Sequence, residues 1–447
     1  MIDNQVHQYL KNAWILWNQL QNKGWNASRA MALNYYHGIT EDFTKEWYSE
    51  KTRKKGPMAN TNITGRIIKR TSLVYMLPPV RTVSDGGDKR RPVDKELYAN
   101  KDIKMQRLER WVNLLQLEVI GVTTRGGKLE HDLITRFVPV YADDPLNPIG
   151  ITFPIQSSKN NNGTVDMWQY WDDEVTFDYN SLSNLQVREN QRDNPYGVSP
   201  YLYVFRDGKP EEKFLGVDID WELVNTNLAI NLNETNKDFN IQFQSFGWAF
   251  ASGPQLPKIL EVGPDKITRV GDEGEIGMVS PPNTVEAIEA GINGKYKRLA
   301  QNHGLPVQFV EGTTAESGIS IRLRNQELQD ERTGDIPKYR KYEKELFELE
   351  KIVADVDLGK NLGEDFNVDF NESVEILSVS EQDAHDKNDI ALNIIDTADI
   401  LIRRDPDKFK DRDAALDHLV ERGMPDPRIV VTPVDNLVAA LAGNATP

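Results

Sequence analysis

Apolar residues recur at helical spacing over roughly the first 110 residues, and β-branched runs replace them from about 115 to 215. In the first part, Ser28 can cap a helix that runs through "NYYHGI", a second stripe through "GRIIKRTSLVYM" ends at Pro78, and a third helix covers "IKMQRLERWVNLLQ". In the second part, Gly-Gly, Asp-Asp-Pro and Asn-Pro turn signals separate the runs. This pattern predicts an α+β body with an antiparallel sheet that has one face in water.

A helix that starts near Asp218 or Asp220 follows the strands. Its apolar stripe repeats at spacings of three and four residues, at Trp221, Val224, Leu228 and Leu232. Asparagines fill much of the opposite side, although Glu and Lys have a better helix propensity on a free surface. We therefore expect this uncharged polar side to pack against another polar surface.

A Gly- and Pro-rich stretch with short strand signals separates this helix from a second one, "NTVEAIEAGINGKYKRLAQNHGLP". Asn283 and Glu286 match a helix-capping pattern at its start, and a Gly and a Pro end it. Gly291 and Gly294 lie inside the helix, where each costs about 1 kcal/mol relative to Ala. The close approach of a neighbouring helix would explain them.

A polar loop leads into the longest helical pattern of the chain, which begins at Gly318. The second half of this pattern has apolar residues at alternating spacings of three and four, which indicates a helix-packing seam: Tyr339, Tyr342, Leu346, Leu349, Val353 and Val356. Gly334 and Pro337 interrupt the pattern, so two interpretations stay open: two helices joined by a turn, or one helix with a proline kink. A strand pattern in "FNVDFNESVEILSV" and short helices complete the chain.

The composition excludes several classes of protein. The chain has 447 residues, 39% of them hydrophobic and 27% charged, which fits a globular protein of about three domains. It lacks cysteine, so disulfides, thiolate zinc sites and Cys nucleophiles are excluded. No apolar run approaches the roughly 18 residues of a membrane span, and the N-terminus predicts an amphipathic helix rather than a signal peptide. We expect the chain to work in a cytosol, or in a particle assembled there.

The net charge of −16 opposes nonspecific binding of nucleic acid, which relies on Lys and Arg. The sequence also lacks a P-loop, a dinucleotide fingerprint, a nucleophile elbow and a pair of histidines at metal-binding spacing. Carboxylates cluster at residues 143–144, at 172–174 and alternately from Asp365 to Asp369, and a nuclease would use such groups to hold Mg²⁺. Solvated turns and a strand with one polar face account for them better. We predict no catalytic residue, no metal and no cofactor.

The order of these segments resembles the portal proteins of tailed bacteriophages. The resemblance is carried from about residue 34 to about 360 by "NYYHGI", "NITGRIIKRTSLVYMLPPV", "NPYGVSPYLYVFRDG", "FQSFG", "RLAQNHGLPVQFV", "SGISIRLRNQEL" and "YRKYEKELFELEKIV". It implies an α+β fold with portal-type architecture: a mixed wing, a two-helix stem, a small β-containing clip, a long kinked helix and a helical C-terminal crown. The implied domains are the wing (1–216 and 318–379), the stem helices (217–240 and 283–304), the clip (241–282), the tunnel loop (305–317) and the crown (380–447).

Portal proteins form rings, usually of about twelve subunits, at one capsid vertex of the virion. The resemblance implies a homo-oligomer that passes double-stranded DNA during packaging and ejection, and that has no enzyme activity. It also implies docking of the terminase large subunit and of neck or tail adaptor proteins, next to major capsid and scaffolding proteins. No membrane is involved. An acidic channel wall fits this role, because it keeps DNA from adhering while it slides.

The same resemblance assigns candidate site residues. The candidates for the DNA channel are Lys295, Arg298, Gln308, Phe309 and Glu311. The candidates for contact with terminase or adaptor in the clip are Lys258, Lys266, Arg269, Asp272 and Glu273. The kink is expected within about three residues of Ile336, at Gly334 and Pro337. The basic group "KYKR" around Lys295 has a second interpretation, as favourable charge near a helix C-terminus.

Two other functions stay open from the sequence. A DNA-processing nuclease would use the acidic clusters, and it requires Asp172, Asp173 and Asp369 to converge in space. A head-completion adaptor would also form a ring, but adaptors are usually shorter and lack the long kinked helix.

Overall fold

The computed structural model describes residues 9–13, 15, 16, 18, 25–54, 56–86, 89–160, 163–180, 188–211, 214, 215, 219–246, 248–252, 274–279, 284–305, 318–370, 386–388, 390, 396–404, 409, 411–422 and 424. The chain divides into two compact units, Met1–Glu372 and Ser373–Pro447. Among the described residues, no helix has the length and apolar character needed to cross a membrane.

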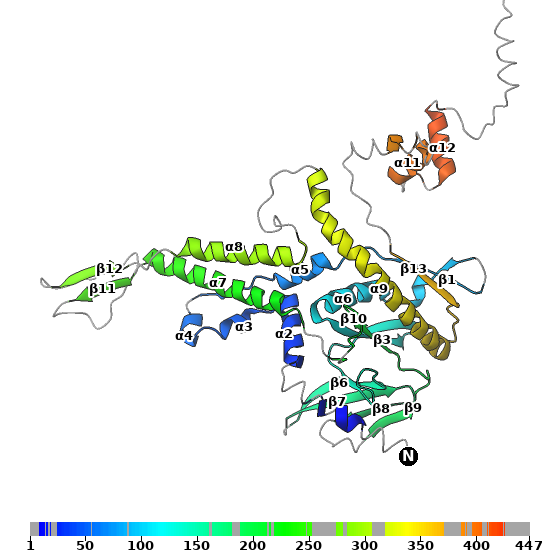
Figure 1. Cartoon of the computed structure of the whole chain (residues 1–447), viewed down its shortest axis with the longest axis horizontal. Coiled ribbons are helices and arrows are strands. Elements are labelled where there is room, and N and C mark those ends of the chain that lie inside the picture. Colours follow the sequence, from blue (N-terminus) through cyan, green and yellow to red (C-terminus); the bar gives the residue numbers. More distant parts are fainter. Residues whose placement is uncertain are drawn as a thin grey trace, which may run out of the picture. The chain divides into compact units, whose positions relative to one another are not determined.

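The N-terminal unit mixes helices and strands, which confirms the α+β prediction (Figure 1). Its helices are α2 (Trp25–His37), α3 (Glu41–Lys45), α4 (Glu50–Arg53), α5 (Thr64–Thr71), the short 3-10 helix η1 (Lys95–Leu97), α6 (Lys101–Leu115), α7 (Trp221–Phe246), α8 (Val285–Asn302) and α9 (Gly318–Leu358). Its strands are β1 (Val80–Ser84), β2 (Arg91–Pro92), β3 (Leu117–Arg125), β4 (Lys128–Leu133), β5 (Val138–Val140), β6 (Gly150–Asn160), β7 (Gly163–Asp172), β8 (Val175–Asn180), β9 (Arg188–Asp193), β10 (Tyr201–Phe205), β11 (Trp248–Ser252), β12 (Glu275–Val279) and β13 (Asp365–Asp369).

The strands from β3 to β10 form two antiparallel sheets, of order β10-β3-β4 and β5-β6-β7-β8-β9. An apolar cluster that contains Phe153 and Trp171 joins the two sheets. On the other face of the larger sheet, Trp168 and Tyr170 are buried together with Leu10. The prediction of a water-exposed face is therefore wrong for the described part of the larger sheet, because side chains at alternate positions are buried on both faces of this sheet.

Helix α5 is shorter than its apolar stripe predicts. It ends at Thr71, well before the predicted stop at Pro78. Beyond it, the backbone amides of Val74 and Tyr75 donate to the two carboxylate oxygens of Glu109, at 2.8 and 3.0 Å. Because Glu109 is buried on α6, this tertiary contact takes amides that a longer helix would have used itself.

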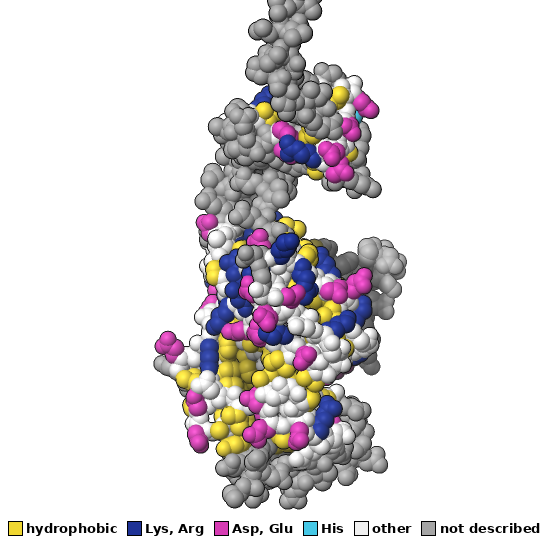
Figure 2. Space-filling model, turned by 90° about the vertical axis from the view of Figure 1, so that its right-hand side faces the viewer, with side chains coloured by type: hydrophobic (Ala, Val, Ile, Leu, Met, Phe, Trp, Pro, Cys, Tyr) yellow, Lys and Arg dark blue, Asp and Glu magenta, His cyan; other side chains and the backbone are white. Residues whose placement is uncertain are grey.

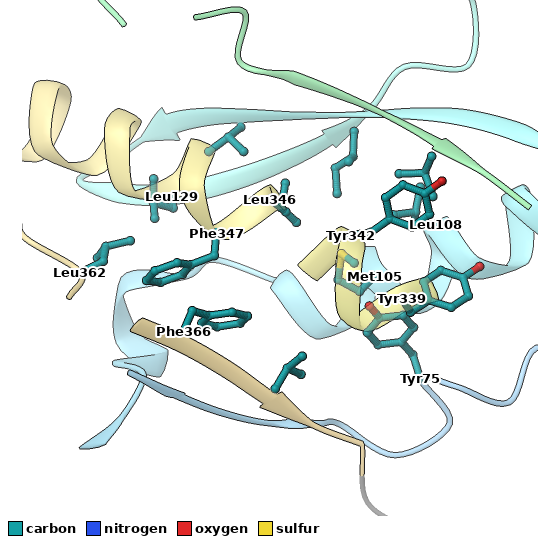
Figure 3. Close-up of a cluster of buried hydrophobic side chains, with 14 of the residues drawn as sticks. Tyr75, Met105, Leu108, Leu129, Tyr339, Tyr342, Leu346, Phe347, Leu362 and Phe366 are labelled. Carbon is teal, nitrogen blue, oxygen red and sulfur yellow. The ribbon is translucent and has the colours of Figure 1, made fainter. Parts of the chain in front are cut away.

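Helix α9 crosses the core of the N-terminal unit. It is one continuous helix from Gly318 to Leu358 with Pro337 inside it, so the interpretation as two helices and a turn is wrong. Its C-terminal half packs against α6, β3 and β13, and the ring of Phe347 stacks on Phe366 of β13 at 4.4 Å between centroids (Figure 3). The predicted seam is confirmed where these residues are buried: Tyr339, Tyr342, Leu346 and Val353. Val356, at the end of the predicted seam, is 46% exposed.

Pro337 removes one backbone hydrogen bond from α9, because it has no N–H to offer the carbonyl of Thr333. The hydroxyl of Thr333 donates to the carbonyl of Gln329 at 2.8 Å, an arrangement that favours bending. A Cβ at Gly334 would meet no atom within 4 Å, so the helix has open space beside it here. A bend within about three residues of Ile336 stays a prediction.

Two carboxylates of α9, those of Glu343 and Glu350, are fully buried among charged partners. Nζ of Lys101 on α6 lies 2.6 Å from Oε1 of Glu350 and 3.5 Å from Oε2 of Glu343. Arg81 of β1 contacts Glu343 through Nη2 at 2.6 Å, and His131 of β4 contacts Glu350 through Nε2 at 2.7 Å. This network joins α9 to α6, β1 and β4 through directional contacts, which an apolar seam alone does not provide.

The pKa values of these carboxyls show whether burial or the neighbouring side chains dominate. Burial would raise the pKa of Glu350, but Lys101 and His131 beside it lower that pKa to about 2. Burial would raise the pKa of Glu343 as well, but Arg81 and Lys101 hold this pKa below its ordinary value. A depressed folded-state pKa adds stability above the unfolded-state pKa of about 4.3, and this stability is lost as the pH falls toward 2. The network therefore stabilises the unit at neutral pH and weakens in acid.

The C-terminal unit has, in its described part, a small core between α11 (Thr397–Arg404) and α12 (Arg412–Glu421). Phe409 and Leu416 are buried in it. Nη1 of Arg412 lies 3.2 Å from Oδ1 of Asp399 and links the two helices. The prediction of short helices after residue 380 is confirmed for α11 and α12.

We predict that Lys101→Met lowers the free energy of unfolding by about 3–5 kcal/mol, because it leaves Glu343 and Glu350 buried with too few partners. The matched control is Lys104→Met on the same helix, whose Nζ lies 3.5 Å from Asp132 at a partly exposed site. Its cost should stay below about 1 kcal/mol. Urea unfolding followed by tryptophan fluorescence measures both losses. Equal losses from the two variants would contradict a structural role for the network.

Candidate functional site on a two-helix arm

The candidate site is the part of the chain from α7 to α8, which we call the arm. Helix α7 has 26 residues and is therefore about 39 Å long, and α8 packs along it (Figure 1). Between the two helices, β11 and β12 pair with each other in an antiparallel hairpin, from Trp248 opposite Val279 to Ser252 opposite Glu275. Two packed helices thus lead to and from a small two-stranded tip.

The asparagine-rich side of α7 confirms the prediction that it packs against a polar surface. Oδ1 of Asn227 accepts from the amides of Ile63 and Thr64 at 3.1 and 3.0 Å, and its Nδ2 donates to the carbonyl of Thr61 at 2.8 Å. Oδ1 of Asn231 accepts from the amide of Thr61 at 2.9 Å. One turn further on, Oγ1 of Thr235 accepts from the amide of Ala59 at 2.9 Å.

These three polar side chains, Asn227, Asn231 and Thr235, are completely buried. They bind the backbone of residues 59–64, and Asn227 also caps the start of α5. The polar surface that Asn227 and Asn231 contact therefore belongs to the same chain. These side chains of α7 bind other parts of the same chain, and so attach the base of the arm to the body.

Helix α8 turns one face inward and leaves the other open. Ile292, Leu299 and Ala300 are buried in the apolar cluster shared with α5 and α7. On Gly291 and Gly294 an added Cβ would meet no atom within 4 Å. The expected neighbouring helix is therefore absent among the described residues of this chain, and the face around the two glycines is open to another molecule.

The two predicted channel cations on α8 lie at its surface. Arg298 is 60% exposed, and its Nε lies 3.7 Å from Oε1 of Glu222 on α7. Lys295 is half-buried. Sequence reasoning missed three further cations, on the exposed side of α5: Arg66, Lys69 and Arg70. The signal for them was the segment "GRIIKRT", in which basic residues flank the two buried isoleucines on both sides.

Polar contacts tie the end of α8 to the start of α7. Nδ2 of Asn302 donates to Oε1 of Glu222 at 2.7 Å. His303 follows directly, with its Nε2 3.6 Å from Oδ2 of Asp220. Burial lowers the pKa of His303, although Asp220 acts in the opposite direction. The segment that leaves α8 thus starts from a fixed point at the base of the arm.

Most of the other predicted site residues lie outside the described residues: the channel candidates Gln308, Phe309 and Glu311, and the clip candidates Lys258, Lys266, Arg269, Asp272 and Glu273. Of the predicted sites, Lys295 and Arg298 on α8 and Gly334 and Pro337 on α9 are described. The structure does not bring these two pairs into one site.

The acidic clusters have structural tasks. Oδ1 of Asp172 accepts from the amides of Glu174 and Val175 at 2.7 and 2.6 Å, and so closes the turn between β7 and β8. Asp173 accepts from the amide of Ser199 at 2.8 Å. Asp369 lies in a different sheet, paired with β1. Within the described ranges, no group of three or more His, Asp or Glu side chains is placed to hold a metal ion.

We predict that Asn227→Ala costs at least about 2 kcal/mol of stability, because it leaves buried amides of Ile63 and Thr64 without an acceptor. Hydrogen exchange should speed up at these two amides. The control is Asn225→Ala, an exposed position on the same helix, which should change stability by less than about 0.5 kcal/mol. Unchanged exchange at residues 61–64 in Asn227→Ala would contradict the anchoring role.

Comparison with known proteins finds matches among solved structures, and two of them are chains of gene transfer agent particles. A chain in a structure of the neck of an empty gene transfer agent particle is 11% identical, with a TM-score of 0.40, and the match covers 79% of this chain and 92% of that chain. A chain in the virion of a native gene transfer agent particle is 9% identical, with a TM-score of 0.36, and the match covers 81% of this chain and 97% of that chain. No family model and no curated protein sequence matches. The chain is thus similar, at low identity, to proteins of gene transfer agent particles.

Proposed function

We propose that the chain is a portal protein, a subunit of a ring at one capsid vertex through which double-stranded DNA passes during packaging and ejection. One observation carries the proposal: the order of α7, the β11–β12 hairpin, α8 and α9. Two helices packed along each other flank a small strand module in the chain, and the next described element is a helix of 41 residues anchored in an α+β body. This order supports a stem of two helices, a clip, and a long helix that enters a wing.

In this proposal residues 1–216 and 318–379 form the wing, and residues 380–447 form the crown. Residues 305–317, between α8 and α9, form the tunnel loop. The clip would contact the terminase large subunit first and neck or tail adaptor proteins later, and major capsid and scaffolding proteins would surround the wing. The chain would then be a component of the virion, assembled in the host cytoplasm.

The open face of α8 supports ring formation. A ring needs a heterologous contact, in which one face of each subunit meets a different face of the next. Gly291 and Gly294 allow a neighbouring helix to approach the backbone of α8 closely, and nothing in the described part of the chain occupies that space. We propose that α7 or α8 of the adjacent subunit fills it, and that about twelve copies close the ring.

The charge distribution supports a conduit rather than a tight grip on DNA. Each copy carries a net charge of −16, so a ring repels DNA on average. On the face drawn in Figure 2, the Lys/Arg and Asp/Glu side chains of the N-terminal unit are interspersed rather than separated by sign. The exposed cations of α8, with Arg298 as the clearest example, would supply brief phosphate contacts.

The two alternatives fit less well. A nuclease needs carboxylates that converge, and in the described ranges Asp172 and Asp173 bind backbone amides while Asp369 lies in a separate sheet. An adaptor ring does not need an arm with a strand tip followed by a 41-residue helix. We therefore propose that the chain has no catalytic activity.

We predict that the purified chain forms closed rings in electron microscopy and native mass spectrometry, with a central hole wide enough for double-stranded DNA. Gly294→Trp should give mostly monomers with an unchanged unfolding temperature, because a Cβ added at this position meets no described atom within 4 Å and the larger side chain extends from the open face of α8. Lys128→Trp, at the exposed start of β4, should still form rings. A stable monomer that cleaves DNA in the presence of Mg²⁺ would overturn the proposed function.

A further inference from the structure

A cleft in the described part of the N-terminal unit lies between strand β10 and helix α9. It has a volume of about 910 Å³. One wall is formed by β10 and the turn after it, and the opposite wall by α9 from Gly334 to Glu345. Neither the arm nor the acidic clusters account for this cleft.

Strand β10 is the edge of its sheet and presents open backbone groups to the cleft. The amide of Val122 donates to the carbonyl of Pro200, and the amide of Arg206 donates to the carbonyl of Gln116. With the observed register, the even-numbered residues of this strand therefore pair with β3. The odd-numbered residues point their N–H and C=O groups away from the sheet, which includes Tyr201, Tyr203 and Phe205.

At one of these positions, a side chain of α9 makes the hydrogen bonds that a partner strand would make. The hydroxyl of Tyr342 accepts from the amide of Phe205 at 3.1 Å and donates to its carbonyl at 3.3 Å. In the part of the chain that the structure describes, no hydrogen bond meets the backbone groups of Tyr201 and Tyr203. Two successive positions of the edge are thus open, and the third is closed by a hydroxyl.

The α9 wall has a distinct order of charges. Asp335, Lys338, Lys341 and Glu345 line the cleft along the helix, so cations occupy the middle of the wall and acids its two ends. Nζ of Lys338 lies 2.7 Å from Asp335, whereas Lys341 is 73% exposed and lies 3.7 Å from Glu345. The centre of this wall therefore attracts an acidic side chain.

The wall on the β10 side is aromatic and contributes further cations. Tyr203, Phe205 and Phe214 line it, with the rings of Tyr203 and Phe214 only 4.8 Å apart. Arg206 and Lys209 line it as well, next to Asp207, while the acid Asp173 is already engaged with a backbone amide. Apolar side chains fit against this wall, opposite the cations of α9.

We propose that the cleft between β10 and α9 binds an extended segment of another protein by strand addition to β10. The segment pairs its backbone with Tyr201 and Tyr203, places an acidic side chain near Lys338 and Lys341, and turns apolar side chains toward Phe214. The two open positions accommodate a strand of about five residues. The proposal does not depend on ring formation, so it can fail or hold whether or not the chain is a portal protein.

The test uses the full chain and the fluorescein-labelled peptide Ser-Thr-Val-Glu-Val-Thr-Ser, with binding followed by fluorescence anisotropy. Binding should slow hydrogen exchange at the amides of Tyr201 and Tyr203. Two analogues carry N-methyl groups on alternate peptide nitrogens, one set on the valines and the other on Glu and the threonines. A strand pairs through one edge only, so one analogue should bind at least tenfold more weakly and the other should bind like the parent.

Variants of the chain test whether the peptide binds in the cleft or elsewhere on the surface. Gly334→Leu adds a side chain to the wall of the cleft at a position where a Cβ meets no described atom within 4 Å, and it should weaken binding at least tenfold at an unchanged unfolding temperature. The control is Lys344→Leu, an exposed position of α9 outside the cleft, which should bind normally. Lys341→Glu should reverse the preference, so that the peptide with Lys in place of Glu binds better.

The proposal is overturned if the peptide shows no binding at millimolar concentration. It is also overturned if both methylated analogues bind like the parent, or if Gly334→Leu and Lys344→Leu bind alike. Ring assembly in the same samples is recorded separately by native mass spectrometry. Rings that do not bind the peptide would refute strand binding in the cleft and leave the proposed function intact. A monomer that binds the peptide would refute the proposed function and leave strand binding in the cleft intact.

Discussion

The burial of Glu343 and Glu350 on one helix is the constraint on which the arrangement of the N-terminal unit depends. Each carboxylate has polar partners on other elements: Arg81 of β1 contacts Glu343, and His131 of β4 contacts Glu350. The ammonium group of Lys101 lies between the two carboxylates. If α9 slid by one turn, both charges would be buried without these partners, at a cost of several kcal/mol. An apolar seam tolerates such shifts far better, so the network selects one register for α9.

That register has consequences at both ends of α9. It places the hydroxyl of Tyr342 against the backbone of Phe205, and thereby sets how much of the β10 edge stays open. It also fixes where the helix enters the body, and Arg332 there donates from Nε to the carbonyl of Leu73 at 3.1 Å. The arm is held by the same kind of contact, since Asn227 and Asn231 bind the backbone of residues 59–64. Directional polar contacts therefore orient both long helical elements, while apolar clusters fill the space between them.

The sequence predicted much of this order, and its failures have physical causes. The spacing of apolar residues located α7, α8, α9 and β13, and the asparagines of α7 correctly indicated a polar packing partner. The pattern did not distinguish Glu350, which is fully buried, from Glu348, which is 58% exposed, because tertiary partners far along the chain decide that difference. The early end of α5 has the same origin, since Glu109 takes the amides that follow it.

The candidate site was less predictable than the fold. Gly291 and Gly294 predicted the close approach of another helix, but no described atom lies within 4 Å of a Cβ added at either position. A single sequence does not tell whether an approaching helix would belong to the same chain. The open edge of β10 left no residue-level signal, because it is made of backbone groups and depends on which strand lies outermost. The sequence showed the cations of α5 in the segment "GRIIKRT". Their position beside the arm became evident only from the structure, in which α5 and α8 share one apolar cluster.

Two surfaces that are open among the described residues share a feature that would bear on the proposed assembly. Both present backbone, through glycines on α8 and through the free edge of β10, rather than a large apolar patch. Copies that each carry a charge of −16 repel one another, and salt reduces this repulsion without supplying attraction. Attraction must then come from close packing and from backbone hydrogen bonds, both of which demand correct geometry. A chain built in this way associates only when the contacting elements are already rigid, and the buried charges of α9 and the asparagines of α7 supply that rigidity.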